Sequence, residues 1–367
     1  MNRVVERIKA EISVHGVIPF ARFMELALYC PDCGYYEKEN DNLGRRGDFY
    51  TSVSVGPLFG QLLAFQFAEW LKLLPGGRVQ LVETGAHDGR LAADILQWLK
   101  QWRPEILERI DYVICELSAR RRKWQRATLK EFLPRVRWLE TDLSQQGGSF
   151  SGIIFSNELL DAMPIHRLGW NAQRRAWFEW GVSAVGDAFS WIRMDGAQFL
   201  SAECPGFQRL AELPGELLDV LPDNFTTEVC PAAENWWHDA AAALQQGRLL
   251  TLDYGLTKEG FFSPHRREGT LRAYHRHKLC EDILANAGDQ DLTAHVNFSA
   301  IQRAGEAAGL RTDLFTTQAD FFAGIMKHFW AEAERNGVWT SERVREFRTL
   351  VHPEHLGRAF RVLVQTR

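Results

Sequence analysis

Short apolar runs alternate with segments of helical spacing through the middle of the chain. The apolar runs, which predict strands, lie at Val79–Glu83, Ile110–Glu116, Val136–Leu139, Gly152–Ser156 and Arg248–Asp253. Helical spacing separates the first three of these runs, at Arg90–Trp102 and in the basic segment Ser118–Phe132. This order is typical of a parallel sheet that is covered by helices on both faces. We therefore predict an α/β fold.

Apolar helices are expected before this region. Hydrophobic residues from Phe20 to Leu28 recur on one face after Pro19, and Pro57 opens a second segment that is apolar on nearly all sides. The second pattern indicates a helix that is buried between layers. The sequence thus predicts an N-terminal part, residues 1–76, ahead of a core over residues 77–367.

Two insertions interrupt the predicted core, near residues 165–230 and near residues 256–290, and a final helix and a final strand are expected after the second. In the first insertion, three segments have the pattern of paired antiparallel strands, at Ile165–Leu168, Ala176–Val182 and Ala188–Arg193. Insertions of this size on such a sheet usually shape a substrate site.

The composition narrows the class of protein. The 367 residues include 43 Lys and Arg against 47 Asp and Glu, and this net charge of -4 argues against a dedicated nucleic-acid-binding protein. No apolar run approaches the roughly 18 to 20 residues that span a membrane. No cleavable presequence is visible, so we expect a cytoplasmic protein.

The cysteines do not indicate a metal site. Of the six, only Cys30 and Cys33 form a C-x-x-C pair, and neither a second pair nor a C-x-x-H partner stands at zinc spacing. The pair follows a helical stretch rather than a strand, so reduced thiols are favoured over a redox or metal motif.

The first candidate motif is the turn Glu83-Thr84-Gly85-Ala86-His87-Asp88-Gly89, which joins a predicted strand to a predicted helix. Turns at this edge of a parallel sheet bind nucleotides, and glycine lets the backbone approach a ligand. The phosphate-loop and G-x-G-x-x-G patterns are both missing. An acid followed by a G-x-x-x-G turn suits a cationic ligand with an amine, such as S-adenosylmethionine. An ordinary tight turn is the alternative.

Glu116, at the end of the second predicted strand, is the next candidate. An acid at this position can accept hydrogen bonds from both ribose hydroxyls of an adenosine. The alternative is a solvated strand end that pairs with Arg120.

Polar residues follow the fourth predicted strand, at Asn157, Glu158 and Asp161. Glu158 and Asp161 are three positions apart, so they would face the same side on one turn of helix. Two carboxylates there would hold a guanidinium group through charge-assisted hydrogen bonds. Helix capping by Asn157 and Asp161 is the alternative, and it suits Glu158 poorly.

A weaker candidate is His295. Polar and apolar residues alternate from Thr293 to Asn297, so Thr293, His295 and Asn297 are expected on one face of a strand. His295 would contact the substrate or relay a proton there, and a structural role is the alternative.

Taken together, these motifs resemble the MidA family of S-adenosyl-L-methionine-dependent methyltransferases, which includes a mitochondrial complex I assembly methyltransferase. The resemblance covers nearly the whole chain, and its motifs are Phe20–Met24, Tyr35–Tyr36, Gly47–Ser52, Glu83–Gly89, Asn157–Pro164, Leu252–Gly255 and Asp291–Phe298. It implies a class I (Rossmann-like) sheet of seven strands, with an N-terminal helical cap and a β-rich insertion. It also implies S-adenosyl-L-methionine as the cofactor.

The resemblance also implies roles for individual residues. Glu83, Gly85 and Gly89 match the cofactor turn, and Glu116 matches the acid that binds the ribose. A loop that closes over the cofactor is matched by Asp48, Thr51 and Ser52, and the motif after the fourth strand by Asn157, Glu158 and Asp161. His87 departs from the family, whose turn usually reads G-x-G-x-G, and its side chain would crowd the methionine end of the cofactor.

The sequence therefore predicts an enzyme that moves a methyl group from S-adenosyl-L-methionine to a protein nitrogen, with arginine as the acceptor that the family implies. The expected partner is a protein substrate, and the oligomeric state is left open. The alternative is a catalytically inactive assembly or binding protein that keeps the fold, for which His87 is the evidence. An NAD-dependent oxidoreductase is disfavoured by the missing G-x-G-x-x-G.

Overall fold

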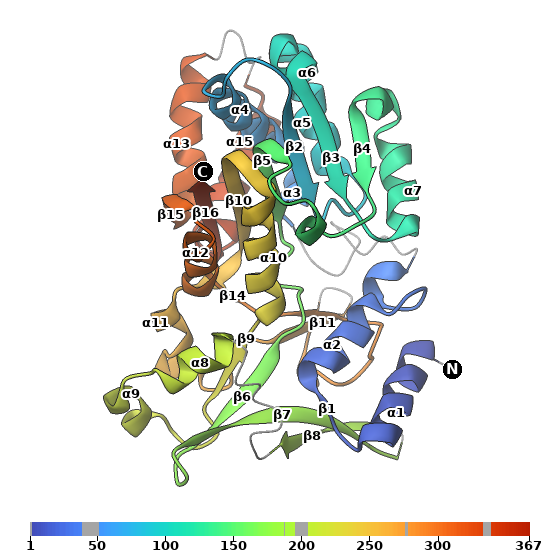
Figure 1. Ribbon diagram of the computed structural model, residues 1–367, viewed down its shortest axis with the longest axis vertical. Coiled ribbons are helices and arrows are strands. Elements are labelled where there is room, and N and C mark those ends of the chain that lie inside the picture. Colours follow the sequence, from blue (N-terminus) through green and yellow to red (C-terminus); the bar gives the residue numbers. More distant parts are fainter. Residues whose placement is uncertain (1, 39–50, 187, 195–204, 276–277, 333–338) are drawn as a thin grey trace.

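A mixed sheet forms the centre of the protein. The computed structural model describes residues 2–38, 51–186, 188–194, 205–275, 278–332 and 339–367, and within them this sheet has eight strands (Figure 1). The strands are β2 Val79–Thr84, β3 Ile110–Cys115, β4 Val136–Leu139, β5 Phe150–Asn157, β10 Leu244–Leu256, β14 Val296–Asn297, β15 Arg311–Thr317 and β16 Phe360–Thr366. Their order is β15-β16-β10-β5-β2-β3-β4, with β14 beside β10.

Most neighbours in this sheet are parallel. β10, β5, β2, β3 and β4 pair in parallel, and β16 lies antiparallel between β10 and β15. The predicted α/β fold is confirmed. Because parallel strands end at the same edge, the residues that follow β2, β3, β5 and β10 are brought together there.

Helices accompany the sheet. They are α3 Ser52–Val55, α4 Leu58–Lys72, α5 Arg90–Trp102, α6 Pro104–Arg109, α7 Ala119–Thr128, α10 Pro231–Ala243, α12 Phe298–Ala307, α13 Gln318–Ala331, α15 Ser341–Val351 and α16 Leu356–Ala359. Pro57 stands directly before α4, as expected, and α4 is buried on several sides. The predicted helix at Arg90–Trp102 is α5 with the same bounds.

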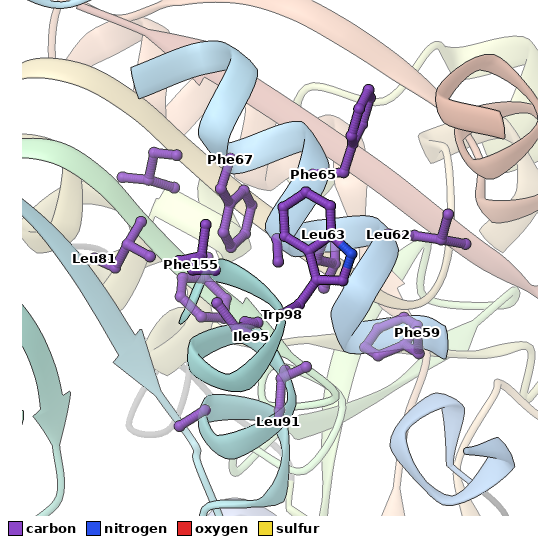
Figure 2. Close-up of a cluster of buried hydrophobic side chains, with 14 of the residues drawn as sticks. Phe59, Leu62, Leu63, Phe65, Phe67, Leu81, Leu91, Ile95, Trp98 and Phe155 are labelled. Atoms are coloured by element: carbon purple, nitrogen blue, oxygen red, sulfur yellow. The ribbon is translucent and has the colours of Figure 1, made fainter. Parts of the chain in front are cut away.

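Alternate strand residues face two hydrophobic clusters, one on each side of the sheet. Leu81 and Phe155 join the first cluster with α4, α5 and α13, and Figure 2 shows both residues beside the aromatic side chains of α4. Val82 and Ile154 join the second cluster with α10 and α12. Burial on both faces explains why these strands are continuous apolar runs in the sequence.

A second group of elements lies at the carboxyl edge of the sheet, in the lower half of Figure 1. It contains a five-stranded sheet, β1-β7-β6-β9 with β8 beside β7, and a three-stranded sheet, β12-β11-β13. These elements are α1 Arg3–His15, β1 Ile18–Pro19, α2 Phe20–Tyr29, the 3₁₀ helix η1 Tyr35–Glu37, β6 His166–Asn171, β7 Ala176–Val185, β8 Ala188–Met194, α8 Pro205–Ala211, α9 Gly215–Val220, β9 Thr226–Val229, α11 Lys258–Phe261, the 3₁₀ helix η4 Pro264–Arg266, β11 Arg272–His275, β12 Lys278–Cys280 and β13 Asp291–Thr293.

The N-terminal part and both insertions fold together. The predicted antiparallel strands of the first insertion are confirmed as β6, β7 and β8, and β1 extends their sheet by pairing with β7. Buried side chains of α1, α2, β7 and β13, among them Ile8, Phe23, Val182 and Leu292, form one cluster. This cluster fixes α2 and η1 beside the carboxyl edge of the main sheet.

Two elements differ from the prediction. The expected strand Thr293–Asn297 is two short strands in different sheets, since β13 pairs with β11 and β14 pairs with β10. The expected helix Ser118–Phe132 ends as α7 at Thr128, and a 3₁₀ helix follows at Lys130–Arg135. Pro134 lies inside this 3₁₀ helix, and proline lacks the N–H group that a continuing α-helix needs.

Membrane insertion by a helix has no support in the described ranges. Every helix there is too short or too polar to span a bilayer.

Candidate active site

The carboxyl edge of the main sheet opens into a cavity of about 1040 Å³. Its walls come from the carboxyl ends of β2, β3, β4, β5 and β10, from the N-terminal part and from the three-stranded sheet. The predicted site residues that line it are Thr51, Glu83, Gly85, Glu116, Asn157, Glu158, Asp161 and His295. Asp48 lies outside the described residues.

The glycine turn after β2 has an unusual backbone. Gly85, His87 and Gly89 all have positive φ, at 80°, 43° and 86°. At Gly85 a Cβ atom would lie 3.1 Å from Leu159 Cδ1, so a side chain there would press on the turn that follows β5. Gly89 is the N-cap of α5. Glycine is therefore favoured by backbone conformation at residues 85 and 89, and a side chain at residue 85 would require Leu159 to shift.

His87 lies on the α7 side of this turn. Its ring centroid is 6.3 Å from that of Trp124 in α7, and its carbonyl accepts a hydrogen bond from Gln125 Nε2 at 3.0 Å. Gly85, by contrast, faces Leu159. The His87 side chain thus lies beside Trp124 of α7, and His87 also lines the cavity.

Glu83 closes the bottom of the cavity. It is 2% exposed, and Tyr112 Oη donates a hydrogen bond of 2.6 Å to its Oε2 atom. Burial raises the pKa of Glu83 to about 7, and the tyrosine hydroxyl opposes part of that rise.

Glu116 is buried in a network and is not the solvated strand end of the alternative interpretation. Its Oε1 atom accepts a hydrogen bond from Ser118 N at 2.9 Å and lies 3.1 Å from Arg121 Nε. Its Oε2 atom accepts a hydrogen bond from Gln125 Nε2 at 3.2 Å. The partner is thus Arg121, whereas Arg120 donates to the carbonyl of Glu37.

Gln125 links this acid to the glycine turn, because its Nε2 atom donates to both Glu116 and the His87 carbonyl. The amide oxygen of the same side chain, Gln125 Oε1, accepts a hydrogen bond of 2.8 Å from Trp138 Nε1. The ends of β2 and β3 therefore form one rigid unit around the cavity.

The N-terminal part reaches the end of β5 through α3. Thr51 and Ser54 form a capping box at the start of α3, with two hydrogen bonds of 3.0 Å. The next amide, Ser52 N, donates to Glu158 Oε1 at 3.0 Å. Thr51 and Ser52 thus lie where the end of the predicted closing loop meets the acidic turn.

Glu158 stands in the left-handed region, at φ 51°. Its Oε1 atom accepts hydrogen bonds from Ser52 N and from Asn157 Nδ2, both at 3.0 Å. Burial raises its pKa to about 8, and these two donors oppose part of the rise.

Asp253 of β10 organises the residues that follow β5. Its Oδ2 atom accepts the backbone N–H groups of Leu159, Leu160 and Asp161, at 3.1, 2.8 and 3.4 Å. Residues 158–161 consequently form a turn, and neither the expected helical turn nor a helix cap at Asp161 is present. Glu158 and Asp161 nevertheless both line the cavity.

Negative charge is concentrated at this turn. Asp161 is 6% exposed, and its burial, together with Asp253, Glu158 and Asp291, raises its pKa well above the ordinary value. Burial raises the pKa of Asp253 to about 7. Within the described parts of the chain, no Lys, Arg or His forms an ion pair with Glu158, Asp161 or Asp253. These three carboxyl groups therefore have no cationic partner among the described residues.

His295 lies between β13 and β14 and lines the cavity. Its backbone N–H donates to Thr270 Oγ1 at 3.0 Å, and its Nδ1 atom is buried without a hydrogen-bond partner. Burial, with Arg266 and Arg272 nearby, lowers its pKa to about 4. The imidazole is therefore neutral near pH 7 and can form a hydrogen bond with a ligand through its Nδ1 atom.

The cysteine pair lies away from this chemistry, in the turn after α2. Cys30 and Cys33 are buried, with their sulfur atoms 2.8 Å apart. Among the residues that the structure describes, no group of three His, Cys, Asp or Glu side chains is arranged to hold a metal ion.

No individual role is expected from the sequence for Asp253, Asp291, Tyr29 or Tyr36. All but Asp253 line the cavity. Asp253 carries a readable signal, because it ends a predicted strand at the same sheet edge as Glu83. Tyr36 belongs to the motif Tyr35–Tyr36, so its only signal is the family resemblance, whereas Tyr29 carries none.

The residues at the ends of β2 and β3 fit S-adenosyl-L-methionine. The turn is tight at Gly85, where a side chain would press on Leu159, and it offers the N-terminus of α5 to a ligand. Glu116, buried at the end of β3, offers carboxylate oxygens where a ribose would lie.

Comparison with known proteins agrees with this geometry. A family model described as "Putative S-adenosyl-L-methionine-dependent methyltransferase" matches residues 62–316. A crystal structure from Burkholderia thailandensis, described as a "likely methyl transferase" bound to S-adenosyl-homocysteine, is 32% identical and superposes with a TM-score of 0.84. That similarity covers 100% of this chain and 92% of the other.

Two curated relatives have named activities. The "Protein arginine methyltransferase NDUFAF7 homolog, mitochondrial" of Drosophila melanogaster is 28% identical over 83% of this chain and 70% of its own length. The "Protein arginine methyltransferase NDUFAF7, mitochondrial" of Mus musculus is 30% identical over 80% of this chain and 67% of its own length. Because these relatives are named as mitochondrial, the predicted cytoplasmic location is contradicted.

Proposed function

Because the chain belongs to the MidA family of S-adenosyl-L-methionine-dependent methyltransferases, we propose that it methylates a nitrogen of an arginine side chain in a protein. The acidic turn after β5 is the observation that carries this acceptor. Glu158 and Asp161 face the cavity with no cationic partner in the described residues, as a site for a cationic side chain requires. The relatives named as protein arginine methyltransferases support the same acceptor.

The cofactor lies, in this proposal, across the ends of β2 and β3. Glu116 accepts hydrogen bonds from the ribose hydroxyls, and Glu83 with the turn from Gly85 to Gly89 holds the rest of the molecule. Thr51 and Ser52, with the preceding Asp48, belong to the segment that closes over it. When bound, S-adenosyl-L-methionine supplies an electrophilic methyl group on a positively charged sulfur.

The acceptor lies at the end of β5. Glu158 and Asp161 hold the guanidinium and orient one nitrogen, because ionised carboxylates accept its N–H groups in charge-assisted pairs. Asn157 positions the Glu158 carboxylate through its amide. Methylation of the nitrogen releases one proton, which Glu158 or Asp161 is placed to accept, while the neutral His295 contacts the substrate. Alignment of the reacting atoms supplies most of the catalysis.

The architecture supports a finer assignment of the fold. We assign the path β15-β16-β10-β5-β2-β3-β4 to the seven-stranded class I methyltransferase sheet. Residues 1–76 act as the N-terminal part that closes the site, and residues 77–367 form the core with insertions near 165–230 and 256–290. The boundary at residue 76 separates two functional parts and not two separately packed domains. Helix α4, which precedes the boundary, packs in the hydrophobic core of the main sheet (Figure 2).

The inactive assembly protein is not favoured. Its main support was His87 in the cofactor turn, and that side chain lies toward Trp124 while the glycines on either side keep their positive φ.

The test is identification of the methylated residue. The protein is incubated with a lysate and with S-adenosyl-L-methionine that carries a labelled methyl group, and labelled proteins are hydrolysed. We expect the label in methylarginine, and only when the protein is present. Label in another amino acid or in a small molecule would refute the arginine acceptor. Absence of all transfer, with cofactor binding intact, would restore the inactive alternative.

A further inference from the structure

The acidic turn is not the only source of carboxylates at this end of the cavity. Asp291, the first residue of β13, lines the same cavity and is 1% exposed. Its field contributes to the raised pKa of Asp161, so the two carboxyl groups lie within electrostatic reach of each other. The backbone joins them as well, because Ala294 N donates to the carbonyl of Asp161 at 2.9 Å.

Asp291 is held in place by the N-terminal part. Tyr36 Oη donates a hydrogen bond of 2.7 Å to Asp291 Oδ1, between residues that are 255 positions apart. Tyr29, whose ring centroid is 5.5 Å from that of Tyr36, donates through Oη to the carbonyl of Ala162 at 2.9 Å. The two tyrosines therefore connect α2 and η1 to both acidic elements.

Aromatic side chains surround these acids. Tyr274 lies directly opposite Asp291 across the antiparallel pair of β11 and β13, so the two side chains share one face of that sheet. Tyr29, Tyr36, Tyr254 and Tyr274 all line the cavity. Electron-rich rings together with carboxylates favour a cation over a neutral group of the same shape.

We propose that Asp291 is a third carboxylate of the acceptor site, and that Tyr36 is the positioning residue that aims it at the guanidinium. This inference rests on the proposed arginine acceptor. It adds that Asp291 and Tyr36 make the acceptor site selective for a guanidinium group. Carboxylates then approach the acceptor from the turn after β5 and from β13. A planar guanidinium, with five N–H donors in a fixed fork, can serve acids on different sides, whereas an ammonium group is a compact point charge.

Peptide binding tests the proposal without relying on turnover. The full-length protein is loaded with S-adenosyl-homocysteine and titrated with a labelled, glycine-flanked arginine peptide. Matched peptides carry citrulline, which is a neutral isostere, or lysine. We expect the arginine peptide to bind more tightly than both in the wild-type protein.

Asp291→Asn is expected to lower the affinity for the arginine peptide by about tenfold or more and to leave the affinity for the citrulline peptide unchanged. The reason is that only the charged peptide loses a charge-assisted hydrogen bond. Tyr36→Phe is expected to lower the affinity for the arginine peptide by about three- to tenfold, through loss of one hydrogen bond, and to raise KM more than it lowers kcat. S-adenosyl-homocysteine affinity, measured for each variant, should stay as in the wild type and shows that the site is folded.

Tyr112→Phe is the matched control for Tyr36→Phe. It removes the same hydroxyl from another tyrosine that donates to a buried acid, here Glu83 at 2.6 Å. It should change affinity for S-adenosyl-homocysteine and leave the preference for arginine over citrulline intact.

The two proposals fail in different ways. If Asp291→Asn and Tyr36→Phe keep the full preference for arginine while Glu158→Gln loses it, Asp291 is not part of the acceptor site and the arginine acceptor stands. If the wild-type protein does not prefer the arginine peptide over citrulline, the arginine acceptor itself is refuted, and the role of Asp291 with it.

Discussion

Replacement of Glu158 by glutamine is the most direct test of how the acidic turn works. The change keeps the shape of the side chain. The Oε1 position accepts Ser52 N and Asn157 Nδ2, and the amide oxygen of glutamine can accept both bonds. What the variant loses is the negative charge. We therefore expect a folded protein whose affinity for S-adenosyl-L-methionine is nearly unchanged.

The size of the effect follows from the lost charge. A hydrogen bond to a charged group contributes about 1.5 to 3 kcal/mol, so at pH values above about 8, where Glu158 is ionised, transfer to an arginine peptide should fall by about 10- to 150-fold. The loss should depend on pH. Burial raises the pKa of Glu158 to about 8, so in the wild-type protein the ionised form, and with it the rate, increases as pH rises toward that value. In Glu158→Gln this rise should be reduced.

Single-turnover transfer is the appropriate measurement, because it separates chemistry from product release. The protein is preloaded with labelled cofactor, mixed with the arginine peptide and quenched over time, while cofactor affinity is titrated separately. Glu83→Gln is the matched control, since it removes another buried carboxyl at the cofactor end of the cavity. Glu83→Gln should change the affinity for the cofactor more than it changes the rate of transfer from bound cofactor. Wild-type transfer rates in Glu158→Gln would refute the role of this charge and move the acceptor elsewhere.

Three further predictions concern the cofactor end and the charge of the site. Glu116→Ala should weaken S-adenosyl-L-methionine binding by about 1 to 3 kcal/mol in calorimetric titration, and unchanged affinity in a folded variant would remove the ribose assignment. His87→Gly should not tighten binding, because the ring lies toward Trp124; a tenfold gain in affinity would show that the ring crowds the cofactor after all. The free energy of unfolding of the ligand-free protein should fall as pH rises from about 6.5 to about 8. The pKa values of Glu83, Asp253 and Glu158 are raised to about 7, 7 and 8. These groups therefore keep protons in the folded state that they have already lost in the unfolded chain. Urea denaturation at several pH values measures this, and stability that rises through the window would contradict the raised pKa values.

The sequence predicts the sheet and the cofactor turn well, because both depend on local patterns. The predicted strand Val79–Glu83 is β2, which extends to Thr84, and the predicted helix Arg90–Trp102 is α5. The glycines at 85 and 89 stand at positive φ, a property that glycine itself makes readable.

The acidic turn is predicted in composition but not in conformation. Glu158 and Asp161 are three positions apart, and that spacing alone suggests a helix. The conformation is instead decided by Asp253, which is 92 to 94 positions away and binds three successive amides of the turn. A contact between distant parts of the chain leaves no periodic trace in either segment, so spacing within the motif cannot reveal it.

The C-terminal region shows a different kind of miss. One final helix and one final strand are expected after residue 291, whereas the structure has α12, β15, α13, α15, α16 and β16 there. The pattern was readable, because Phe321, Phe322, Ile325 and Phe329 of α13 recur at helical spacing and are buried in the core. The hydrogen bond from Tyr36 to Asp291, like the contacts of Asp253, could not be predicted from local patterns, because it joins residues 255 positions apart.

The charge of the site follows from the reaction that we propose. Cofactor and guanidinium each bring one positive charge, and two cations in one cavity repel each other unless negative charge lies close to both. Without ligands, burial raises the pKa values of Glu158, Asp161 and Asp253, and neighbouring carboxylates add to the rise for Glu158 and Asp161. After transfer the sulfur is neutral, the methylated guanidinium is still positive, and one proton has been released. Carboxyl groups with raised pKa values can take up that proton, which lowers the negative charge that holds the product. The carboxyl cluster, which must balance two cations before transfer, therefore loses negative charge after transfer, when only one cation remains.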